Sequence, residues 1–293
     1  MGGLMTDGCR PCVVIWTIFL LSSVMGYKPV IIVHGILDGP RQFEILAKFI
    51  NQSHPGTSVT TLALYDYIGS MKPLWQQVDG FREAIRPIME STDDGVHLIC
   101  FSQGGLICRG VLATLPTHNA HSLILLSSPL AGQYGDSSYL KHFFPKFIKS
   151  RLYHFCYTTC GQRISICNYW NDPHQRERYL KSSIYLAPLN GEIEHANSTA
   201  WRDSFLRIQT LVLIGGQDDG VITPWESRSL QRFISSRDIE HQKFEMYSLS
   251  DAFGLKTLNS EGAVVKCVVP GVHHTSWHSN HTVYKNCIDK WLT

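Results

Sequence analysis

The segment Val96-His97-Leu98-Ile99-Cys100-Phe101-Ser102-Gln103-Gly104-Gly105 decides the fold class of this 293-residue chain. Its first part is a mainly apolar run, typical of a buried strand, and a helical pattern through Leu106 and Val111 follows. A strand that turns sharply into a helix at a serine is a nucleophile elbow, which raises the serine hydroxyl above the sheet. Cys100 replaces the first glycine of the usual G-x-S-x-G pattern, so the motif is imperfect. We predict that Ser102 is a nucleophile; the alternative is a buried structural serine.

Similar buried-strand patterns lie on both sides of this elbow. They cover residues 29–33, 59–64, 123–126, 210–214 and 263–269. Amphipathic helical patterns separate several of them, at residues 40–50 and 74–88. Such alternation predicts an α/β protein with a mostly parallel central sheet and right-handed crossovers. With the elbow, it predicts one α/β-hydrolase catalytic domain over residues 27–293.

Residues 130–207 break this alternation and are far longer than an ordinary connecting loop. We predict an inserted lid there. The segment is rich in aromatic residues, which suits the wall of an apolar ligand site: Phe143, Phe144, Phe147, Tyr153, Phe155, Tyr157, Tyr169 and Trp170. A small satellite core is the alternative explanation.

The first 26 residues have the pattern of a cleaved secretory signal peptide, with Arg10 before a short apolar run and small residues after it. The run is shorter than a membrane-spanning helix requires, and we predict no transmembrane segment in the mature chain. Sequons at Asn51, Asn197 and Asn280 predict glycosylation. Of nine cysteines, Cys9 and Cys12 leave with the signal, so disulfides among the remaining seven leave one thiol unpaired.

A serine nucleophile requires a base and an orienting carboxylate, which in this fold follow the serine in the order Asp, His. Asp218 and Asp219 lie in a tight loop after the 210–214 strand, and we favour Asp219, while one of the two caps the turn. His273 and His274 lie in the loop after the last strand, and one should be the base.

A metal site is the alternative interpretation of this histidine-rich stretch. His274 and His278 have the spacing of a ligand pair on one helix face, and His281 follows them. The H-E-x-x-H pattern is absent from the sequence and the serine nucleophile already explains one histidine, so we predict no metal.

The loop His34-Gly35-Ile36 follows the first strand, from which this fold supplies one oxyanion N–H group. We expect the second N–H from Gln103, the residue after the nucleophile. An ordinary strand-ending turn is the alternative for the 34–36 loop. The net charge is only +2, with no basic run, so we predict no nucleic-acid partner.

Together these motifs resemble the palmitoyl-protein thioesterase family across essentially the whole mature chain. The resemblance rests on residues 34–36, 100–105, 216–225 and 273–278, and residues 167–170 and 253–258 resemble its lysosomal branch, in which a cysteine also replaces the first elbow glycine. The resemblance implies a triad of Ser102, Asp219 and His274, with oxyanion donors on the backbone of Ile36 and Gln103. It also implies disulfides Cys100–Cys108, Cys156–Cys167 and Cys267–Cys287, which would leave Cys160 free.

The activity implied by this resemblance is hydrolysis of long-chain acyl thioesters through an acyl-serine intermediate. The substrate would be an acyl-CoA or an S-acylated cysteine, and no cofactor or obligate protein partner is needed. The resemblance implies residence in the lysosome lumen, with some secretion. An oxygen-ester lipase or esterase is the enzyme alternative, since the same triad cleaves oxygen esters. A lipid-binding protein that retains the fold without turnover is the alternative from another class.

Overall fold

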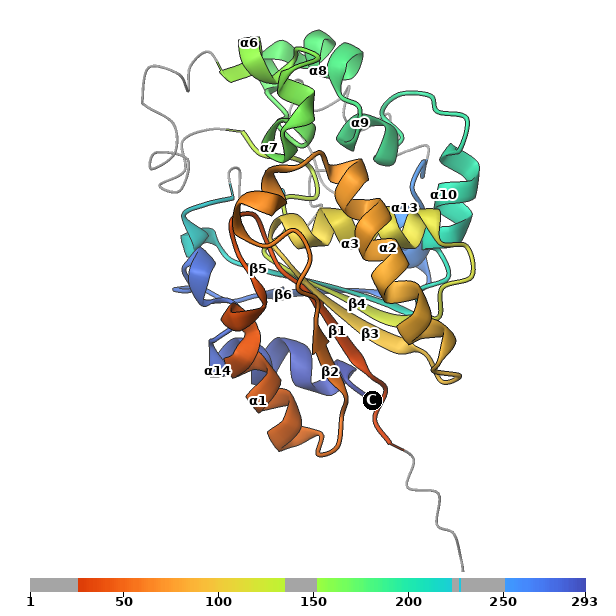
Figure 1. Ribbon diagram of the computed structural model, residues 1–293, viewed down its shortest axis with the longest axis vertical. Coiled ribbons are helices and arrows are strands. Elements are labelled where there is room, and N and C mark those ends of the chain that lie inside the picture. Colours follow the sequence, from red (N-terminus) through yellow and green to blue (C-terminus); the bar gives the residue numbers. More distant parts are fainter. Residues whose placement is uncertain (1–25, 135–151, 223–226, 228–250) are drawn as a thin grey trace, which may run out of the picture.

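A six-stranded parallel sheet forms the centre of the computed structural model, which describes residues 26–134, 152–222, 227 and 251–293 (Figure 1). The strands are β1 (Val30–Val33), β2 (Val59–Thr61), β3 (Val96–Phe101), β4 (Ala120–Leu126), β5 (Thr210–Gly215) and β6 (Val264–Val268). They lie in the order β2-β1-β3-β4-β5-β6, and each neighbouring pair is parallel. The α/β class predicted from the sequence is confirmed.

Helices cover both faces of the sheet (Figure 1). One face packs against α2 (Leu74–Glu90), α3 (Gln103–Thr114), α10 (Ser198–Phe205) and α13 (Leu255–Ser260). The other packs against α1 (Glu44–Ser53) and the C-terminal segment with α14 (His281–Val283) and the π-helical turn η9 (Tyr284–Ile288). Side chains alternate along each strand, so Ile31 contributes to the first core and Ile32 to the second. Burial on both faces explains why these strands read as apolar runs.

Short 3-10 helices connect these larger elements. They are η1 (Pro40–Phe43), η2 (Tyr67–Met71), η3 (Gly161–Arg163), η4 (Pro173–Gln175), η5 (Gln217–Asp219), η8 (His274–Ser276) and η10 (Asp289–Trp291). Two of them, η5 and η8, directly follow the loops at the ends of β5 and β6. Asp219 and His274 therefore both lie at the carboxyl edge of the sheet.

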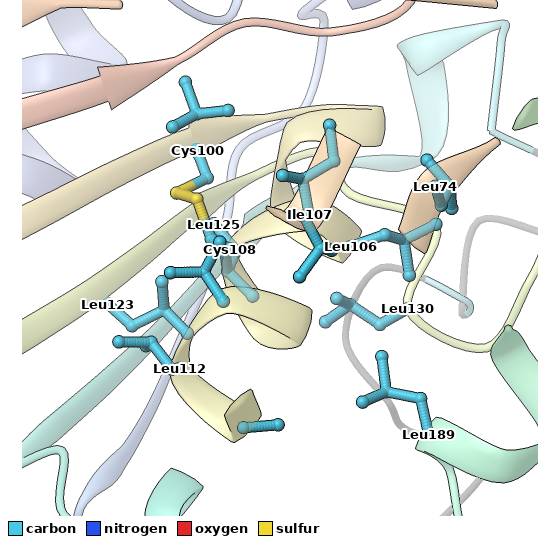
Figure 2. Packing of buried hydrophobic residues seen from close by; sticks show 14 of the residues in the cluster. Leu74, Cys100, Leu106, Ile107, Cys108, Leu112, Leu123, Leu125, Leu130 and Leu189 are labelled. Carbon is cyan, nitrogen blue, oxygen red and sulfur yellow. A yellow bond between two sulfur atoms is a disulfide. The ribbon is translucent and has the colours of Figure 1, made fainter. Parts of the chain in front are cut away.

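A disulfide between Cys100 and Cys108 joins β3 to α3 on either side of the elbow (Figure 2). Both cysteines are fully buried in the core between the sheet and α3. Figure 2 shows the disulfide near Leu112, Leu123 and Leu125. Cys100 thus occupies the place of the missing glycine by directing its side chain into a covalent link. A loop of this length contributes about 2–3 kcal/mol by restricting the unfolded chain.

The described part of the segment between β4 and β5 contains four short helices before α10, which lie at one end of the molecule (Figure 1). They are α6 (Leu152–Cys156), α7 (Ser165–Asn168), α8 (Arg176–Ser182) and α9 (Leu186–Leu189). The segment is an insertion relative to the β-α alternation, and its function as a lid stays a prediction. Phe143, Phe144 and Phe147 lie outside the described residues.

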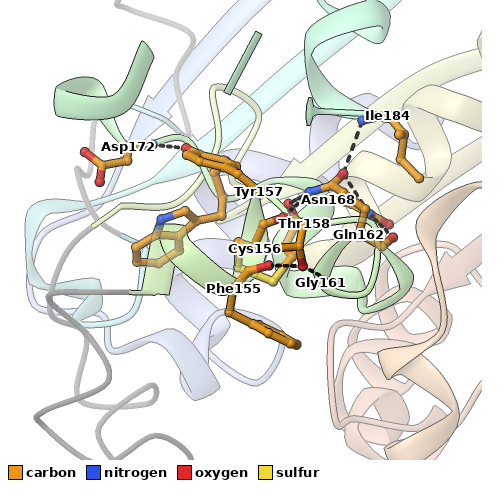
Figure 3. The surroundings of a disulfide bond; sticks show 11 residues. Phe155, Cys156, Tyr157, Thr158, Gly161, Gln162, Asn168, Asp172 and Ile184 are labelled. Carbon is orange, nitrogen blue, oxygen red and sulfur yellow. Dashed lines mark hydrogen bonds between the residues drawn. A yellow bond between two sulfur atoms is a disulfide. The ribbon is translucent and has the colours of Figure 1, made fainter. Parts of the chain in front are cut away.

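A second disulfide, Cys156–Cys167, holds the first two of these helices together (Figure 3). The buried side chain of Gln162 lies beside it, and its Nε2 donates to the carbonyl oxygens of Cys156 and Cys167, both at 2.8 Å. Asn168 donates from Nδ2 to the Gln162 carbonyl at 2.7 Å and accepts the Leu74 N–H at 2.8 Å. Polar side chains thus fix this part of the insertion and bind it to the start of α2.

A buried polar network attaches the insertion to the nucleophile helix. Arg109 of α3 is buried and donates from Nη1 to Asn190 Oδ1 at 2.9 Å. Asn190 donates to Glu192 at 2.9 Å, and Glu192 forms an ion pair with Arg176 of α8. The Arg109 guanidinium also lies over the Phe253 ring, 4.7 Å from its centroid. Burial lowers the pKa of Arg109 to about 10, so the group remains a cation at neutral pH.

The third disulfide, Cys267–Cys287, joins β6 to the C-terminal segment. The three observed pairs are those that the resemblance implies, and Cys160 is free and exposed. Asn51 and Asn197 are exposed, whereas Asn280 is half-buried and accepts the Val283 N–H at 3.1 Å. Glycosylation at these positions stays a prediction.

The predicted signal peptide falls almost entirely on residues 1–25, which lie outside the described part of the chain. Its cleavage stays a prediction. Within the described residues, none of the helices has the length and apolar character needed to cross a membrane.

Candidate active site

Ser102 lies at a strained turn between β3 and α3. Its backbone has φ 52° and ψ −123°, in a region that residues with a side chain rarely adopt. The Ser102 N–H donates to the Leu126 carbonyl at 2.8 Å, which ties the turn to β4. A methyl group on Gly104 would lie 2.5 Å from the Val33 carbonyl oxygen, and one on Gly105 would lie 2.0 Å from Ser128 Oγ. The elbow therefore requires glycine at both positions.

His274 and Asp219 lie in a hydrogen-bonded row with Ser102. Ser102 Oγ is 2.9 Å from His274 Nε2, and His274 Nδ1 is 2.9 Å from Asp219 Oδ2. In the neutral tautomer that fits this row, Nδ1–H donates to the carboxylate and Nε2 accepts the serine proton. All three side chains are buried. The structure therefore brings together the three residues chosen from the sequence; their catalytic roles remain a proposal.

Among the described residues, the Asp219 carboxylate accepts hydrogen bonds from four further groups. Oδ1 accepts the N–H groups of Val221 at 3.0 Å and Ile222 at 2.9 Å. Oδ2 accepts the Ser127 hydroxyl at 2.5 Å and the Trp277 indole N–H at 2.6 Å, besides His274. Hydrogen bonds to a charged group contribute about 1.5–3 kcal/mol each, so this set offsets the burial of the charge.

We call Ser127, Asp219, His274 and Trp277 the acid–base cluster. The sequence did not indicate Ser127 or Trp277 as site residues, although Trp277 lies within the 273–278 stretch. Ser127 is fully buried just after β4 and has a positive φ of 45°. Its position as a short polar residue directly after a buried parallel strand is the one signal that could have indicated it.

The other candidates from the sequence, Asp218, His273 and His278, lie outside the hydrogen-bonded row. Asp218 is exposed, and its carboxylate accepts the Gly271 N–H at 2.8 Å, which joins the loop after β5 to the loop after β6; the turn after Asp219 is capped by Asp219 itself, through Val221 and Ile222. His273 is exposed. His278 is buried between the rings of Phe43 and Phe101, with ring centroids 4.9 and 5.2 Å away. In the described part of the chain, His, Cys, Asp and Glu side chains form no group that could hold a metal ion.

Ile36 and Gln103, the expected oxyanion donors, flank Ser102 from two elements. Ile36 lies in the loop after β1 and lines the same cavity as Ser102. Gln103 is the first residue of α3, a position at which the N–H has no acceptor within the helix. A methyl group on Gly35 would lie 3.0 Å from Ser102 Cβ, so the loop and the elbow are in close approach. The oxyanion role of these two N–H groups stays a prediction.

Ser70 connects the loop after β1 to the start of α3 through hydrogen bonds. Its Oγ accepts the Leu37 N–H at 2.6 Å and donates to the Tyr67 carbonyl at 2.5 Å. Its carbonyl accepts the side-chain Nε2 of Gln103 at 2.9 Å and of Gln77 at 2.8 Å. We call Leu37, Ser70, Gln77 and Gln103 the oxyanion cluster. Its hydrogen bonds run mainly between side chains and the backbone.

A cavity of about 250 Å³ opens at Ser102 and His274. Its lining is mainly apolar, with Ile36, Leu37, Phe101, Ile166, Tyr169, Val221 and Ile222, and the polar side chains are Asp38, Gln42, Gln133, Thr275 and His278. Ile166 and Tyr169 come from the insertion, so part of the aromatic segment does line the site. A mainly apolar cavity with a few polar groups at a nucleophile suits a lipid-like acyl group.

Two titratable groups in this lining have shifted pKa values. Burial raises the pKa of Asp38, against the hydrogen bond from the Gly39 N–H and the nearby His34 and His274, which lower it. Burial, with a smaller effect of His274, lowers the pKa of His278 to about 4. His278 is therefore neutral at any pH above about 5.

Comparison with known proteins identifies close relatives. A family model described as palmitoyl protein thioesterase matches residues 29–274. The chain is 53% identical to lysosomal thioesterase PPT2 of Bos taurus over 267 residues, which cover 91% of this chain and 88% of the relative. It is 52% identical to lysosomal thioesterase PPT2 of Homo sapiens with the same coverage. A Drosophila melanogaster homologue of lysosomal thioesterase PPT2 is 36% identical, over 93% of this chain and 94% of the relative.

Proposed function

The chain belongs to the palmitoyl protein thioesterase family and is a thioester hydrolase, and from this membership we propose that it cleaves long-chain fatty-acyl thioesters in the lysosome. The observation that carries this proposal is the row Ser102, His274 and Asp219, of which Ser102 and His274 line a mainly apolar cavity. The row supplies a nucleophile and a base, and the cavity accommodates an acyl chain.

In the proposed mechanism, His274 Nε2 takes the proton from Ser102 Oγ as the oxygen attacks the acyl carbonyl carbon. The N–H groups of Ile36 and Gln103 stabilise the resulting oxyanion. Collapse of this intermediate breaks the carbon–sulfur bond, and the imidazolium of His274 supplies the proton to the leaving thiol. An acyl-serine ester remains on the enzyme.

Water then completes the reaction. His274 removes a proton from the attacking water, the second tetrahedral intermediate collapses, and the proton returns to Ser102 Oγ as the fatty acid leaves. Asp219 holds the imidazole in the required tautomer in both halves. These steps use only groups of the chain and water.

We assign an acyl-CoA as the preferred substrate and an S-acylated cysteine as the second. The acyl chain would contact the apolar lining that includes Ile166 and Tyr169 of the insertion. Residence in the lysosome is supported by the relatives whose names include it and by the signal pattern and sequons of this chain. Glycans on Asn51, Asn197 or Asn280 would carry the sorting signal.

The test is release of coenzyme A thiol from palmitoyl-CoA by the purified protein, with a p-nitrophenyl palmitate assay in parallel. Cys160 is a free, exposed thiol that would react with the detection reagent, so all variants are made in a Cys160→Ser background. Ser102→Ala should abolish thiol release. Ser165→Ala, which truncates a buried serine distant from the row in sequence, is the matched control and should keep it.

Each outcome decides between the candidate functions. Thiol release that is lost only in Ser102→Ala supports the serine thioesterase. Faster turnover of the oxygen ester than of the thioester would favour a lipase or esterase. If neither substrate turns over while labelled palmitate binds, the proposal is wrong and the protein is a lipid binder.

A further inference from the structure

The Asp219 carboxylate has more hydrogen-bond donors than the orientation of His274 requires. Oδ2, the oxygen that faces His274 Nδ1, also accepts the Ser127 hydroxyl at 2.5 Å and the Trp277 indole N–H at 2.6 Å. Both extra donors are neutral, and both side chains are at least 99% buried. Neither lines the cavity at Ser102. Ser127 Oγ also lies 3.4 Å from His274 Nδ1. The two side chains therefore act on the Asp219–His274 pair and not on the substrate.

We propose that Ser127 and Trp277 are positioning residues that keep the Asp219–His274 pair active in an acidic compartment. The inference rests on the proposed function, because a lysosomal hydrolase needs a base that is unprotonated in acid. It assigns this property to two neutral donors on one carboxylate oxygen.

The first part of the argument concerns Asp219 itself. A hydrogen bond donated to a carboxylate stabilises its charged form over the neutral acid. The Ser127 and Trp277 donors thus oppose protonation of Asp219 as the pH falls. If the carboxylate became an acid, it would lose its role as acceptor for His274 Nδ1–H, and the tautomer would no longer be fixed.

The second part concerns His274, and it likewise predicts that the two donors extend activity to lower pH. The negative charge on Oδ2 stabilises the imidazolium form of His274, and this form cannot accept the Ser102 proton. Two neutral donors share that charge, so the imidazolium gains less from it. Removing either donor should therefore move the acidic limb of the activity profile to higher pH.

Other charged and titratable groups also face His274, and they stay constant in the test. Asp38, from the loop after β1, and His278 interact electrostatically with His274. His273 and Asp218 are exposed neighbours along the chain. Because substitution of Ser127 or Trp277 changes none of these groups, a shift between variant and wild type reports the two donors.

The experiment is a profile of kcat/KM from pH 4.5 to 8 for wild type, Trp277→Phe and Ser127→Ala, measured as release of labelled palmitate from palmitoyl-CoA. In each variant we expect the acidic limb to move up by about 0.5–1 pH unit, which lowers activity near pH 5 by about 3- to 10-fold. The ratio of variant to wild type should approach its highest value at pH 8, and KM should be unchanged.

The chain offers a matched control for each variant. Trp291 packs against the same core as Trp277, and its indole nitrogen has no hydrogen-bond partner among the described residues. Ser128 adjoins Ser127, and its buried hydroxyl likewise has none in the described part. Trp291→Phe and Ser128→Ala therefore make similar changes to packing without touching Asp219, and their acidic limbs should coincide with that of wild type.

A loss of activity by the same factor at every pH would overturn the inference, as would an equal shift in the controls. Thermal unfolding at pH 5 and 7.5 shows whether a variant is folded, and if Trp277→Phe does not fold, Ser127→Ala alone decides. Wild-type turnover at pH 7.5 tests the proposed function by itself. The ratio of variant to wild type across pH tests only the role of the two donors.

Discussion

The acid–base cluster and the oxyanion cluster meet at Ser102 but are built from different interactions. In the acid–base cluster, side-chain donors converge on the charged Asp219 carboxylate. In the oxyanion cluster, the Ser70 hydroxyl and carbonyl mainly join neutral groups of the backbone and of glutamine side chains. Hydrogen bonds to a charge change with protonation, whereas those between neutral groups do not. One side of the site should therefore respond to pH and the other should not.

Both clusters contain strained backbone, which shows that tertiary contacts hold them in place. Six residues other than glycine have positive φ in the described chain: Leu37, Tyr65, Tyr67, Ser102, Ser127 and Asp251. Apart from Asp251, these residues lie at the elbow, at Ser127, in the loop after β1 or in the segment after β2 that contains Ser70. The Leu37–Ser70 hydrogen bond joins that loop to that segment. Such conformations cost about 1–3 kcal/mol each and persist where the surroundings over-determine them.

The largest expected effect breaks the acid–base cluster at its centre. Asp219→Asn should lower kcat by about 10⁴-fold at neutral pH, because an amide cannot accept all three donors at Oδ2 and favours the wrong tautomer of His274. The measurement is palmitoyl-CoA hydrolysis at pH 7.5. Asp218→Asn is the control, with an expected change of about twofold or less, since Asp218 is exposed and its carboxylate accepts the Gly271 N–H, away from His274. Inactivation by Asp218→Asn instead would show that the carboxylate is misassigned.

The next effect tests the oxyanion cluster. Ser70→Ala should lower kcat by about 10- to 100-fold, less than direct removal of an oxyanion donor, because the Ser70 hydroxyl holds the backbone of Leu37, next to Ile36, and does not touch the oxyanion. KM should change little, and the loss should be the same from pH 5 to 8. Ser165→Ala serves as the buried-serine control here too. A pH-dependent loss in Ser70→Ala would remove the distinction between the two clusters.

The smallest expected effect is on stability, and it allows loss of activity by protonation of the active site to be distinguished from unfolding in acid. Burial lowers the pKa of His118 to about 4, with a smaller contribution from Arg207. Neutral His118 accepts the Ala120 N–H at Nδ1 and donates from Nε2 to the Ser204 carbonyl. Because the folded-state pKa lies below the unfolded value near 6.5, the unfolded chain binds the proton first. Stability is therefore lost as the pH falls from about 6.5 towards 4.

Between pH 7.5 and 5 this one histidine should reduce the free energy of unfolding by about 1–2 kcal/mol. His118→Gln removes the titration, so its loss of stability over the same range should be smaller by that amount. Urea unfolding at the two pH values measures the difference. Equal losses in the variant and in wild type would mean that His118 is not the source, and acid-limb data would then need correction for unfolding from other groups.

The sequence by itself determined the parallel α/β architecture and where the candidate site residues stand along the chain. Buried parallel strands leave continuous apolar runs, and the residues of the elbow follow one another directly, so both are local patterns. Ser102 and Asp219 could be chosen because this fold presents its nucleophile and its acid after separate strands, here β3 and β5, in a fixed order. The choice of His274 over His273 came from the family resemblance. The disulfide pairs came from family resemblance and not from spacing, since seven cysteines allow many pairings.

Only the tertiary structure decided which side chains support those residues. Ser127 and Trp277 are separated from Asp219 by 92 and 58 residues, and Ser70 is separated from Leu37 and Gln103 by 33 residues each. No periodicity or motif in the sequence predicts which acceptor a serine hydroxyl or a tryptophan indole N–H will bond. Its partner is fixed when the loops at the carboxyl edge of the sheet come together, which is a property of packing and not of local sequence.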